Sequence, residues 1–186
     1  MVAVAVLVMP QALNAGSAPL DHAGRVHCDA TGRITATDRE RLGRVLAMDM
    51  DPGSVVTIPA ICPAEHYFPT GVLVTPGATY QISAQGLWKD SWITVGPQGW
   101  YGLLLEAWNR LPWRRFFLLC GSIGRSDEQA FAIGASRRWR APDVIRSADD
   151  RQLYLFANDW PSKYDNNRAV SDADGGPMRV AIQRIK

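Results

Sequence analysis

Residues 152–167 read Gln-Leu-Tyr-Leu-Phe-Ala-Asn-Asp-Trp-Pro-Ser-Lys-Tyr-Asp-Asn-Asn. The run 152–157 is apolar on both faces, which is typical of a strand at the centre of a packed β-sandwich. The ten residues that follow offer two carboxylates and three carboxamides on turn-forming backbone. The stretch therefore predicts a central strand that holds one end of an oxygen-rich loop against the core.

Further short strands are predicted on both sides of this one. β-branched and alternating runs are separated by turn signals, among them Pro76-Gly77 and Gly96-Pro97-Gln98-Gly99. Many short strands with such punctuation favour an all-β fold, an antiparallel β-sandwich. The strands are predicted at 55–58, 71–74, 79–88, 116–123, 130–133, 152–157 and 178–185. Residues 100–115 are predicted to form a long loop with a short helical turn.

The N-terminal third follows a different pattern. Thr37 and Glu40 have the spacing of a capping box, and apolar residues follow at helical spacing. We therefore predict one helix over about 38–47, ended by Pro52-Gly53. The chain divides into an N-terminal extension, residues 1–63, that carries this helix, and a β-sandwich domain, residues 64–186. Whether strands near 55–60 add an edge to the sandwich stays open.

The start of the chain and the cysteines bear on the compartment. Residues 2–9 are apolar and small residues follow at 15–18, as in a signal peptide, but no Lys or Arg precedes them. A buried strand left from an upstream domain is the alternative, weighed evenly, and a secreted or cell-envelope location is slightly favoured over the cytoplasm. Three cysteines make no disulfide framework, and a Cys28–Cys62 bridge is left open.

Composition argues against two classes of partner. The net charge of +2, with 20% charged residues, is not that of a polyanion binder, so we expect no nucleic acid. A cluster of Arg137, Arg138 and Arg140 around Trp139 is interpreted as a solvated strand edge or loop rather than a phosphate site. No run reaches the roughly 18 apolar residues of a transmembrane helix.

The loop at 158–167 has the chemistry of a calcium site. Ca²⁺ takes about six to eight oxygen ligands from carboxylates, carboxamides and backbone carbonyls. The loop contains no His or Cys that would favour zinc or copper. The alternative is an ordinary polar turn, because Asn and Asp are common in loops. The residues alone leave both interpretations open.

The chain from about residue 66 to 186 resembles the PA-IL-like family of bacterial calcium-dependent galactose-binding lectins. The family's loop, Asn-Asp-x-Pro-x-x-Tyr-x-Asn-Asn, matches residues 158–167 without a gap. Its Gly-Pro-Gln-Gly loop, Pro-Gly hairpin and strand ending in Ile-Gly are matched in order at 96–99, 76–77 and 123–124. The resemblance implies a jelly-roll, galactose-binding-domain-like sandwich that binds carbohydrate through Ca²⁺.

The resemblance also implies residue roles. Asp159, Asn166 and Asn167 would bind the calcium ion through side-chain oxygens, and Lys163 and Val74 through backbone carbonyls. Hydroxyl groups of a sugar would complete the coordination, and Asp159 and Asn166 would also hydrogen-bond them.

The loop after Gly99 departs from the family. The His that contacts sugar in the family is absent, and Glu106 is the nearest polar candidate for a second sugar contact. Trp100 and Trp160 are expected to line the site, with capping of the core as the alternative. A galactose-type glycan is therefore only the default ligand.

Function is predicted as a carbohydrate-binding domain without catalysis. Ser122 lacks the first glycine of a nucleophile elbow, and no histidine or carboxylate pair is indicated beside it. The alternative is a non-catalytic accessory module of a larger bacterial hydrolase or effector, with the metal site structural or lost. The oligomeric state is left open, with a homo-oligomer among the options.

Overall fold

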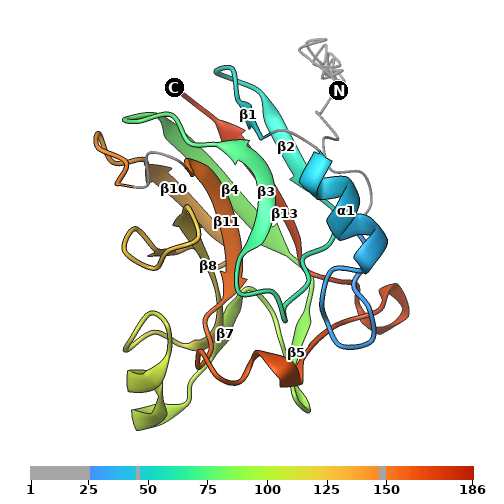
Figure 1. Ribbon diagram of the computed structural model, residues 1–186. Helices are drawn as coiled ribbons and strands as arrows, with labels where there is room; N and C mark the ends of the chain where they lie inside the picture. The colour runs from blue at the N-terminus through green and yellow to red at the C-terminus, as the bar shows by residue number, and fades with distance from the viewer. Residues whose placement is uncertain (1–25, 45–46, 147–149) are drawn as a thin grey trace, which may run out of the picture.

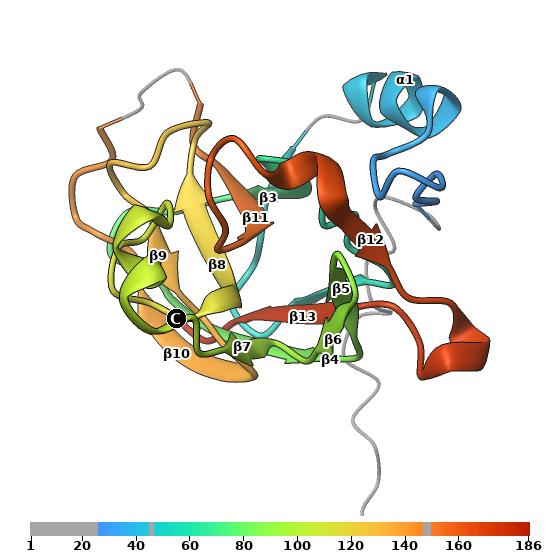
Figure 2. The same cartoon turned by 90° about the horizontal axis from the view of Figure 1, so that it is seen from below.

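Two facing β-sheets form the body of the protein in the computed structural model, which describes residues 26–44, 47–146 and 150–186 (Figure 1). Figure 2 shows the two layers, with β3, β11 and β8 on one side and β13, β4 and β10 on the other. Every strand pair except β1–β3 is antiparallel among the named strands. The predicted all-β sandwich is confirmed.

The larger sheet has six strands in the order β1-β3-β11-β8-β7, with β9 paired to β8, and the facing sheet has the order β10-β4-β13-β2. A third sheet, β12-β5-β6, closes the end of the sandwich at which β11 finishes (Figures 1 and 2). The strands are β1 Met48–Asp49, β2 Val55–Ile58, β3 Phe68–Leu73, β4 Thr79–Gln85, β5 Trp88–Asp90, β6 Ile93–Val95, β7 Gln98–Trp100, β8 Phe116–Ile123, β9 Phe131–Ala132, β10 Ser136–Arg140, β11 Gln152–Ala157, β12 Asn167–Ala169 and β13 Arg179–Arg184.

β8 and β11 are the central strands, as predicted. All but one residue of each strand is buried, because both faces are covered by other parts of the chain. Their apolar composition therefore reflects burial on two sides rather than the alternation of a half-exposed strand. Large side chains from both sheets fill the core, among them Trp88, Tyr80, Phe68, Phe117, Ile58, Ile82 and Leu153.

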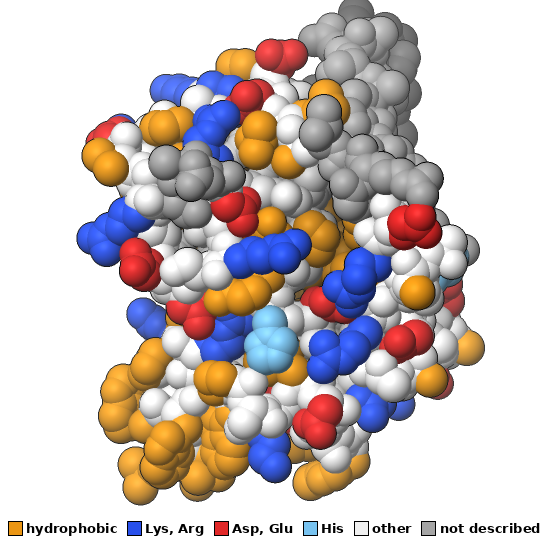
Figure 3. All heavy atoms as spheres, viewed as in Figure 1, with side chains coloured by type: hydrophobic (Ala, Val, Ile, Leu, Met, Phe, Trp, Pro, Cys, Tyr) orange, Lys and Arg blue, Asp and Glu red, His pale blue; other side chains and the backbone are white. Residues whose placement is uncertain are grey.

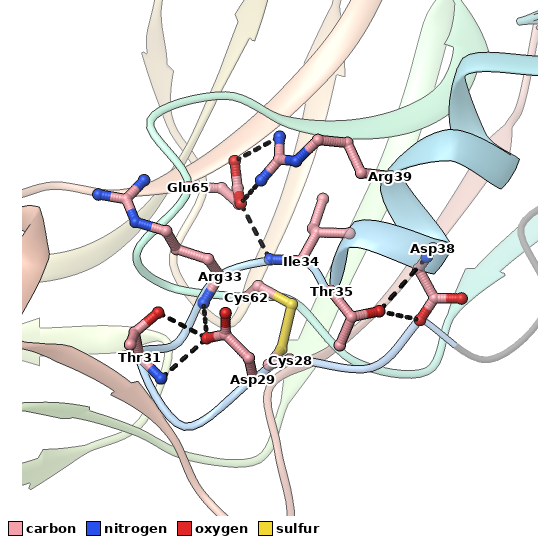
Figure 4. A network of polar contacts seen from close by, with 10 residues as sticks. All are labelled: Cys28, Asp29, Thr31, Arg33, Ile34, Thr35, Asp38, Arg39, Cys62 and Glu65. Carbon is pink, nitrogen blue, oxygen red and sulfur yellow. Dashed lines mark hydrogen bonds and ion pairs between the residues drawn. A yellow bond between two sulfur atoms is a disulfide. The ribbon is translucent and has the colours of Figure 1, made fainter.

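The predicted helix exists but begins earlier. α1 covers Ala36–Arg44, and Thr35 rather than Thr37 caps it, since the Asp38 amide donates to Thr35 Oγ1 at 3.3 Å (Figure 4). Asp38 takes the place expected for Glu40, because its carboxylate accepts the Thr35 hydroxyl at 3.2 Å. The capping chemistry was predicted correctly and its register was wrong by two residues.

The extension and the sandwich are joined more closely than a boundary at residue 63 implies. β2 pairs with β13 at the edge of the four-stranded sheet, so residues 55–58 belong to the sandwich. Cys28 and Cys62 form a disulfide, which answers the question left open by the sequence (Figure 4). Cys120 is a buried free thiol in β8.

Three short 3₁₀ helices complete the described elements: η1 Leu103–Trp108, η2 Tyr164–Asn166 and η3 Asp172–Asp174. η1 confirms the helical turn predicted within 100–115. The apolar start of the chain, interpreted as a signal segment or an upstream strand, lies outside the described residues. Within those residues, no helix has the length and hydropathy needed to cross a bilayer.

Candidate functional site

The polar loop at 158–167 folds back onto the end of the sandwich. It leaves β11 at Ala157 and returns through η2 into β12, whose Asn167 pairs with Asp90 of β5. Asp159 is only 3% exposed and Asn167 is fully buried, although both are polar. The β5–β12 pairing thus brings Asn167 beside a carboxylate from a distant segment, and Asp159 lies near enough to Asp90 for the two charges to interact.

Hydrogen bonds connect these residues. Asn166 Nδ2 donates to Asp90 Oδ1 at 3.1 Å, and the Trp160 amide donates to Asp159 Oδ1 at 2.7 Å. Asn167 Nδ2 donates to the Pro63 carbonyl at 3.1 Å, so Oδ1 of the same carboxamide points away from Pro63. We call Asp90, Asp159, Asn166 and Asn167 the oxygen cluster.

Three oxygens of this cluster are buried without a hydrogen-bond donor. They are Asp159 Oδ2, Asn166 Oδ1 and Asn167 Oδ1. Leaving a buried acceptor unpaired costs about 1–3 kcal/mol, and more when the group is charged. Three such atoms from one ten-residue loop could all be satisfied by a ligand that accepts electron pairs, such as a hard cation.

The electrostatics of the cluster favour the same ligand. The pKa of Asp159 is raised to about 7, mainly by burial and also by the negative charges of Asp90 and Asp165, against the opposing hydrogen bond from the Trp160 amide. Burial also raises the pKa of Asp90, against the opposing hydrogen bonds from Trp100 and Asn166. Two carboxylates that are costly to ionise together would be stabilised by a positive ion between them.

The residues present fit calcium better than a transition metal. The cluster supplies two carboxylates and two carboxamides, with no sulfur or imidazole. In the described ranges, no group of three or more His, Cys, Asp or Glu side chains is placed to hold a metal. The fit therefore rests on the mixture of carboxylate and carboxamide oxygens.

Lys163 lies at the start of η2, within the same loop. Its carbonyl accepts the Asn166 amide at 3.5 Å, which is the long limit of a hydrogen bond, so this oxygen keeps most of its capacity to bind another partner. Its backbone role stays a prediction.

Val74 does not join the cluster, which corrects its predicted role as a ligand. It follows β3 at the end where Leu73 pairs with Gln152, the first residue of β11, whereas Asp159 follows the last. Six strand residues separate the two ends, roughly 20 Å at the rise of a β-strand. The Val74 carbonyl instead accepts from Arg151 Nη1 at 3.4 Å.

Asp90 is the functional candidate that sequence analysis missed. A signal was present, since an acidic residue closes the run Leu87-Trp88-Lys89-Asp90 shortly before the Gly96–Gly99 loop. Its neighbour Ser91 has a left-handed φ of 54° and donates its amide to the Asn166 carbonyl at 3.2 Å. Such backbone strain, about 1–3 kcal/mol, is found most often at functional sites.

The predicted aromatic residues lie beside the cluster. Trp100 Nε1 donates to Asp90 Oδ2 at 3.2 Å, and its ring stacks on Phe116 with centroids 5.0 Å apart. Trp160 packs against Phe116 on one side and edge-on against Trp108 on the other, at 6.2 Å. Trp108 is 63% exposed, so a row of rings leads from the polar cluster to the surface.

Glu106 is turned to a different contact. Its Oε1 accepts the Gly102 amide at 3.1 Å, which closes the turn of η1. It also lines a separate hollow of about 220 Å³ with Tyr101, Trp113 and Arg115. Its predicted sugar contact finds no support in these positions.

Asn158 and Arg110 hold the loop in place. The Asn158 side chain is fully buried and bonds the backbone of the facing loop, accepting from the Leu111 amide at 2.8 Å and donating to the Arg115 carbonyl at 3.0 Å. The Arg110 amide donates to the Asp159 carbonyl at 3.1 Å, and its guanidinium lies over the Phe156 ring at 3.7 Å. These contacts fix where Asp159 leaves the sheet.

Comparison with known proteins adds one finding. No protein-family model matches the chain, and no curated protein matches it. Among solved structures, the chain is similar to one described as "EclA N-terminal domain; PllA-like lectin", with 21% sequence identity and a TM-score of 0.44. The match covers 66% of this chain and 90% of that one.

Proposed function

We propose that the protein is a non-catalytic, calcium-dependent carbohydrate-binding domain. The observation that carries the proposal is the set of three buried, unpartnered oxygens on Asp159, Asn166 and Asn167. The match of residues 158–167 to the loop of the lectin family that the sequence resembles supports the same assignment.

The oxygen cluster would hold the ion. Asp159 and Asp90 supply negative charge, Asn166 and Asn167 supply neutral oxygens, and the Lys163 carbonyl is a further candidate. A bound Ca²⁺ supplies positive charge and coordination positions for hydroxyl oxygens. Asp159 and Asn166, whose unpartnered oxygens belong to the cluster, are the residues that would accept hydrogen bonds from those hydroxyls.

The indole of Trp160 would provide the apolar half of the sugar site. It is half-buried beside Asp159, and its Nε1 donates to the Leu105 carbonyl at 3.2 Å, which fixes the ring plane. A rigid indole face packs on the apolar face of a sugar ring with little loss of side-chain entropy. A galactose-type glycan is the first ligand to test.

A glycan array with and without EDTA tests the proposal, followed by titration of the best ligand. We expect binding only when calcium is present. We expect Trp160→Ala to lower the affinity for the sugar about tenfold, in the range of one lost aromatic contact. The affinity for calcium should stay within twofold of wild type. Trp113→Ala is the matched control, because Trp113 is an exposed indole of the neighbouring loop that lines the separate hollow around Glu106.

A structural calcium ion without sugar binding is the second candidate. The burial of Asn167 and Asp159 favours it, because an ion at that depth would join β12 to the end of β11 whatever else it did. Calcium binding together with an empty array, tested against a broad set of neutral and acidic glycans, would select this function over the first.

A further inference from the structure

A cleft lies between the N-terminal extension and the sandwich, and none of its lining residues belongs to the oxygen cluster. Its cavity volume is about 530 Å³, and Figure 3 shows basic side chains gathered around a hollow in the middle of this face. One wall comes from the turn before α1 and from α1 itself, and the other from the segments around β3, β8 and β11. The charged lining residues are Arg33, Arg39, Glu65 and Arg125, and the polar ones are His66, Tyr67 and Gln152.

The lining has more positive than negative charge. Three arginines face one carboxylate, that of Glu65. Glu65 is 8% exposed and already engaged, because its Oε1 accepts the Ile34 amide at 2.9 Å and its carboxylate pairs with Arg39. The charges of Glu65 and Arg39 thus offset one another, and the positive charges of the other two lining arginines are not neutralised within the cleft.

Arg33 and Arg125 are these two arginines. Figure 4 shows the Arg33 guanidinium on the side of Glu65 away from Arg39, with no interaction drawn to it. Within residues 26–44, 47–146 and 150–186, the structure gives neither side chain an ion pair with a carboxylate; Arg125 lies over the Tyr154 ring at 5.6 Å. The Asp29 carboxylate, outside the cleft lining, interacts with Arg33 through space, and Asp150 contacts the Tyr154 hydroxyl next to Arg125. The two guanidinium groups still add positive charge to one cleft in a protein of small net charge.

The neutral part of the lining suits a polar ligand. His66 stacks on Tyr164 at 4.1 Å, and burial together with the charges of Arg110 and Arg33 lowers its pKa, so a neutral imidazole is present at pH 7. Gln152 adds a carboxamide at the far wall. A cleft of this volume is within the range of small-molecule sites.

We propose that this cleft binds an oxyanion, a carboxylate or sulfate group, through Arg33 and Arg125. The planar guanidinium matches the geometry of both anions, donating two parallel hydrogen bonds. The group could be a free inorganic anion or the acidic substituent of a monosaccharide, whose neutral hydroxyls would face Gln152 and His66. None of the cleft residues belongs to the oxygen cluster, so the proposal does not depend on calcium.

The cleft exists because the extension is held against the sandwich. The Cys28–Cys62 disulfide and the contact of Gly32 with the Asn167 carbonyl, 2.4 Å from where a Cβ would lie, place the segment that carries Arg33. The turn at 29–33 is also closed on itself, since Asp29 Oδ1 accepts the amides of Thr31 and Arg33 at 2.8 and 3.1 Å. Arg33 is therefore positioned by local structure before any ligand arrives.

Calorimetric titration of the full chain in EDTA tests the proposal, with sodium sulfate, D-glucuronate and neutral D-glucose as probes at constant ionic strength. We expect heat of binding from sulfate or glucuronate and none from glucose. Arg33→Ala and Arg125→Ala should each weaken binding roughly tenfold or more, the value of one charged hydrogen bond. Arg138→Ala on β10, an exposed arginine of the facing sheet, should change it less than twofold.

The probes separate the two sources of the anion. Tighter binding of glucuronate than of sulfate would assign an acidic sugar, and equal or tighter binding of sulfate would assign a free inorganic oxyanion. Arg33→Lys, which keeps the charge and loses the paired donors, should bind less tightly than wild type and retain the wild-type melting temperature. No heat from either anion, or heat that both alanine variants leave unchanged, would overturn the proposal.

Discussion

Asp159 combines three properties that are seldom found together in one carboxylate. It is 3% exposed, one of its oxygens has no hydrogen-bond donor, and its pKa is raised to about 7. The neighbouring Asp90 is buried as well, and burial is also the main reason why its pKa is raised. An ion-free cluster of this kind stores unfavourable energy that a bound cation would release.

This residue predicts how stability changes with pH. In the ion-free fold Asp159 keeps its proton up to about pH 7, whereas in the unfolded chain the carboxyl loses it near its ordinary pKa of 3.8. Between these values the folded state binds more protons, so the free energy of unfolding falls as pH rises. Melting temperatures in EDTA should therefore fall as the pH rises from about 4 to about 7. The rise in melting temperature that calcium causes should become larger over the same pH range.

Asp159→Asn is the control for this prediction. It removes the titrating group and keeps the shape of the side chain, so the decline with pH should be smaller in this variant. Parallel curves for the two proteins, each measured with chelator, would show that other groups cause the change and that Asp159 ionises normally.

At the scale of elements, the sandwich end is built from segments far apart in sequence. Asp90 reaches the loop at 158–167 only because β5 pairs with β12, and β7 carries Trp100 to Asp90 because it pairs with β8. The site therefore depends on the correct register of short edge strands.

These pairings also explain what could be predicted from sequence. β2, β8 and β11 were predicted with their observed bounds, because dense apolar runs indicate buried strands. β10 was not predicted as a strand, since four of its five residues are exposed and only Trp139 is buried. Asp159, Asn166 and Asn167 came from a local motif, whereas Asp90 and the misplaced Val74 depend on pairings that no local pattern contains.

A substitution at Gly99 tests the role of β7, the strand that positions Trp100. It has a φ of 65°, and a Cβ there would lie 2.1 Å from the Phe116 carbonyl oxygen. Gly99→Ala should lower the free energy of unfolding by about 2–4 kcal/mol, from backbone strain and the lost β7–β8 approach together. Urea denaturation followed by tryptophan fluorescence measures this.

Gly53→Ala is the matched control. Gly53 has a φ of 87° but no heavy atom lies within 4 Å of its added Cβ, so only the conformational strain remains, about 1 kcal/mol. Equal losses in the two variants would mean that the approach of β7 to β8 contributes nothing.

At the scale of the whole molecule, a disulfide and hydrogen bonds tie the extension to the sandwich. The disulfide joins residues 34 positions apart, and Arg168 of β12 donates to the Thr31 carbonyl at 3.2 Å. Constraining a loop of this length stabilises the fold by about 3–4 kcal/mol in the chain-entropy model. Both proposed sites lie against the extension, at Asn167 and at Arg33.

Loss of the disulfide should therefore be felt in stability. We expect Cys28→Ala/Cys62→Ala to lose about 3–4 kcal/mol in urea denaturation. A reducing agent should lower the stability of the wild type toward this value and leave the double variant unchanged. A wild type that is indifferent to reductant under unfolding conditions would contradict the stabilising role of the bridge.

The central claim is that the oxygen cluster binds calcium, and calorimetric titration of calcium into the EDTA-treated, desalted chain tests it most directly. We predict one site per chain, lost in Asp159→Asn and kept in Asp143→Asn, an exposed aspartate paired with Arg140 elsewhere on the surface. No heat of binding at millimolar calcium, or equal binding by wild type and Asp159→Asn, would contradict the account.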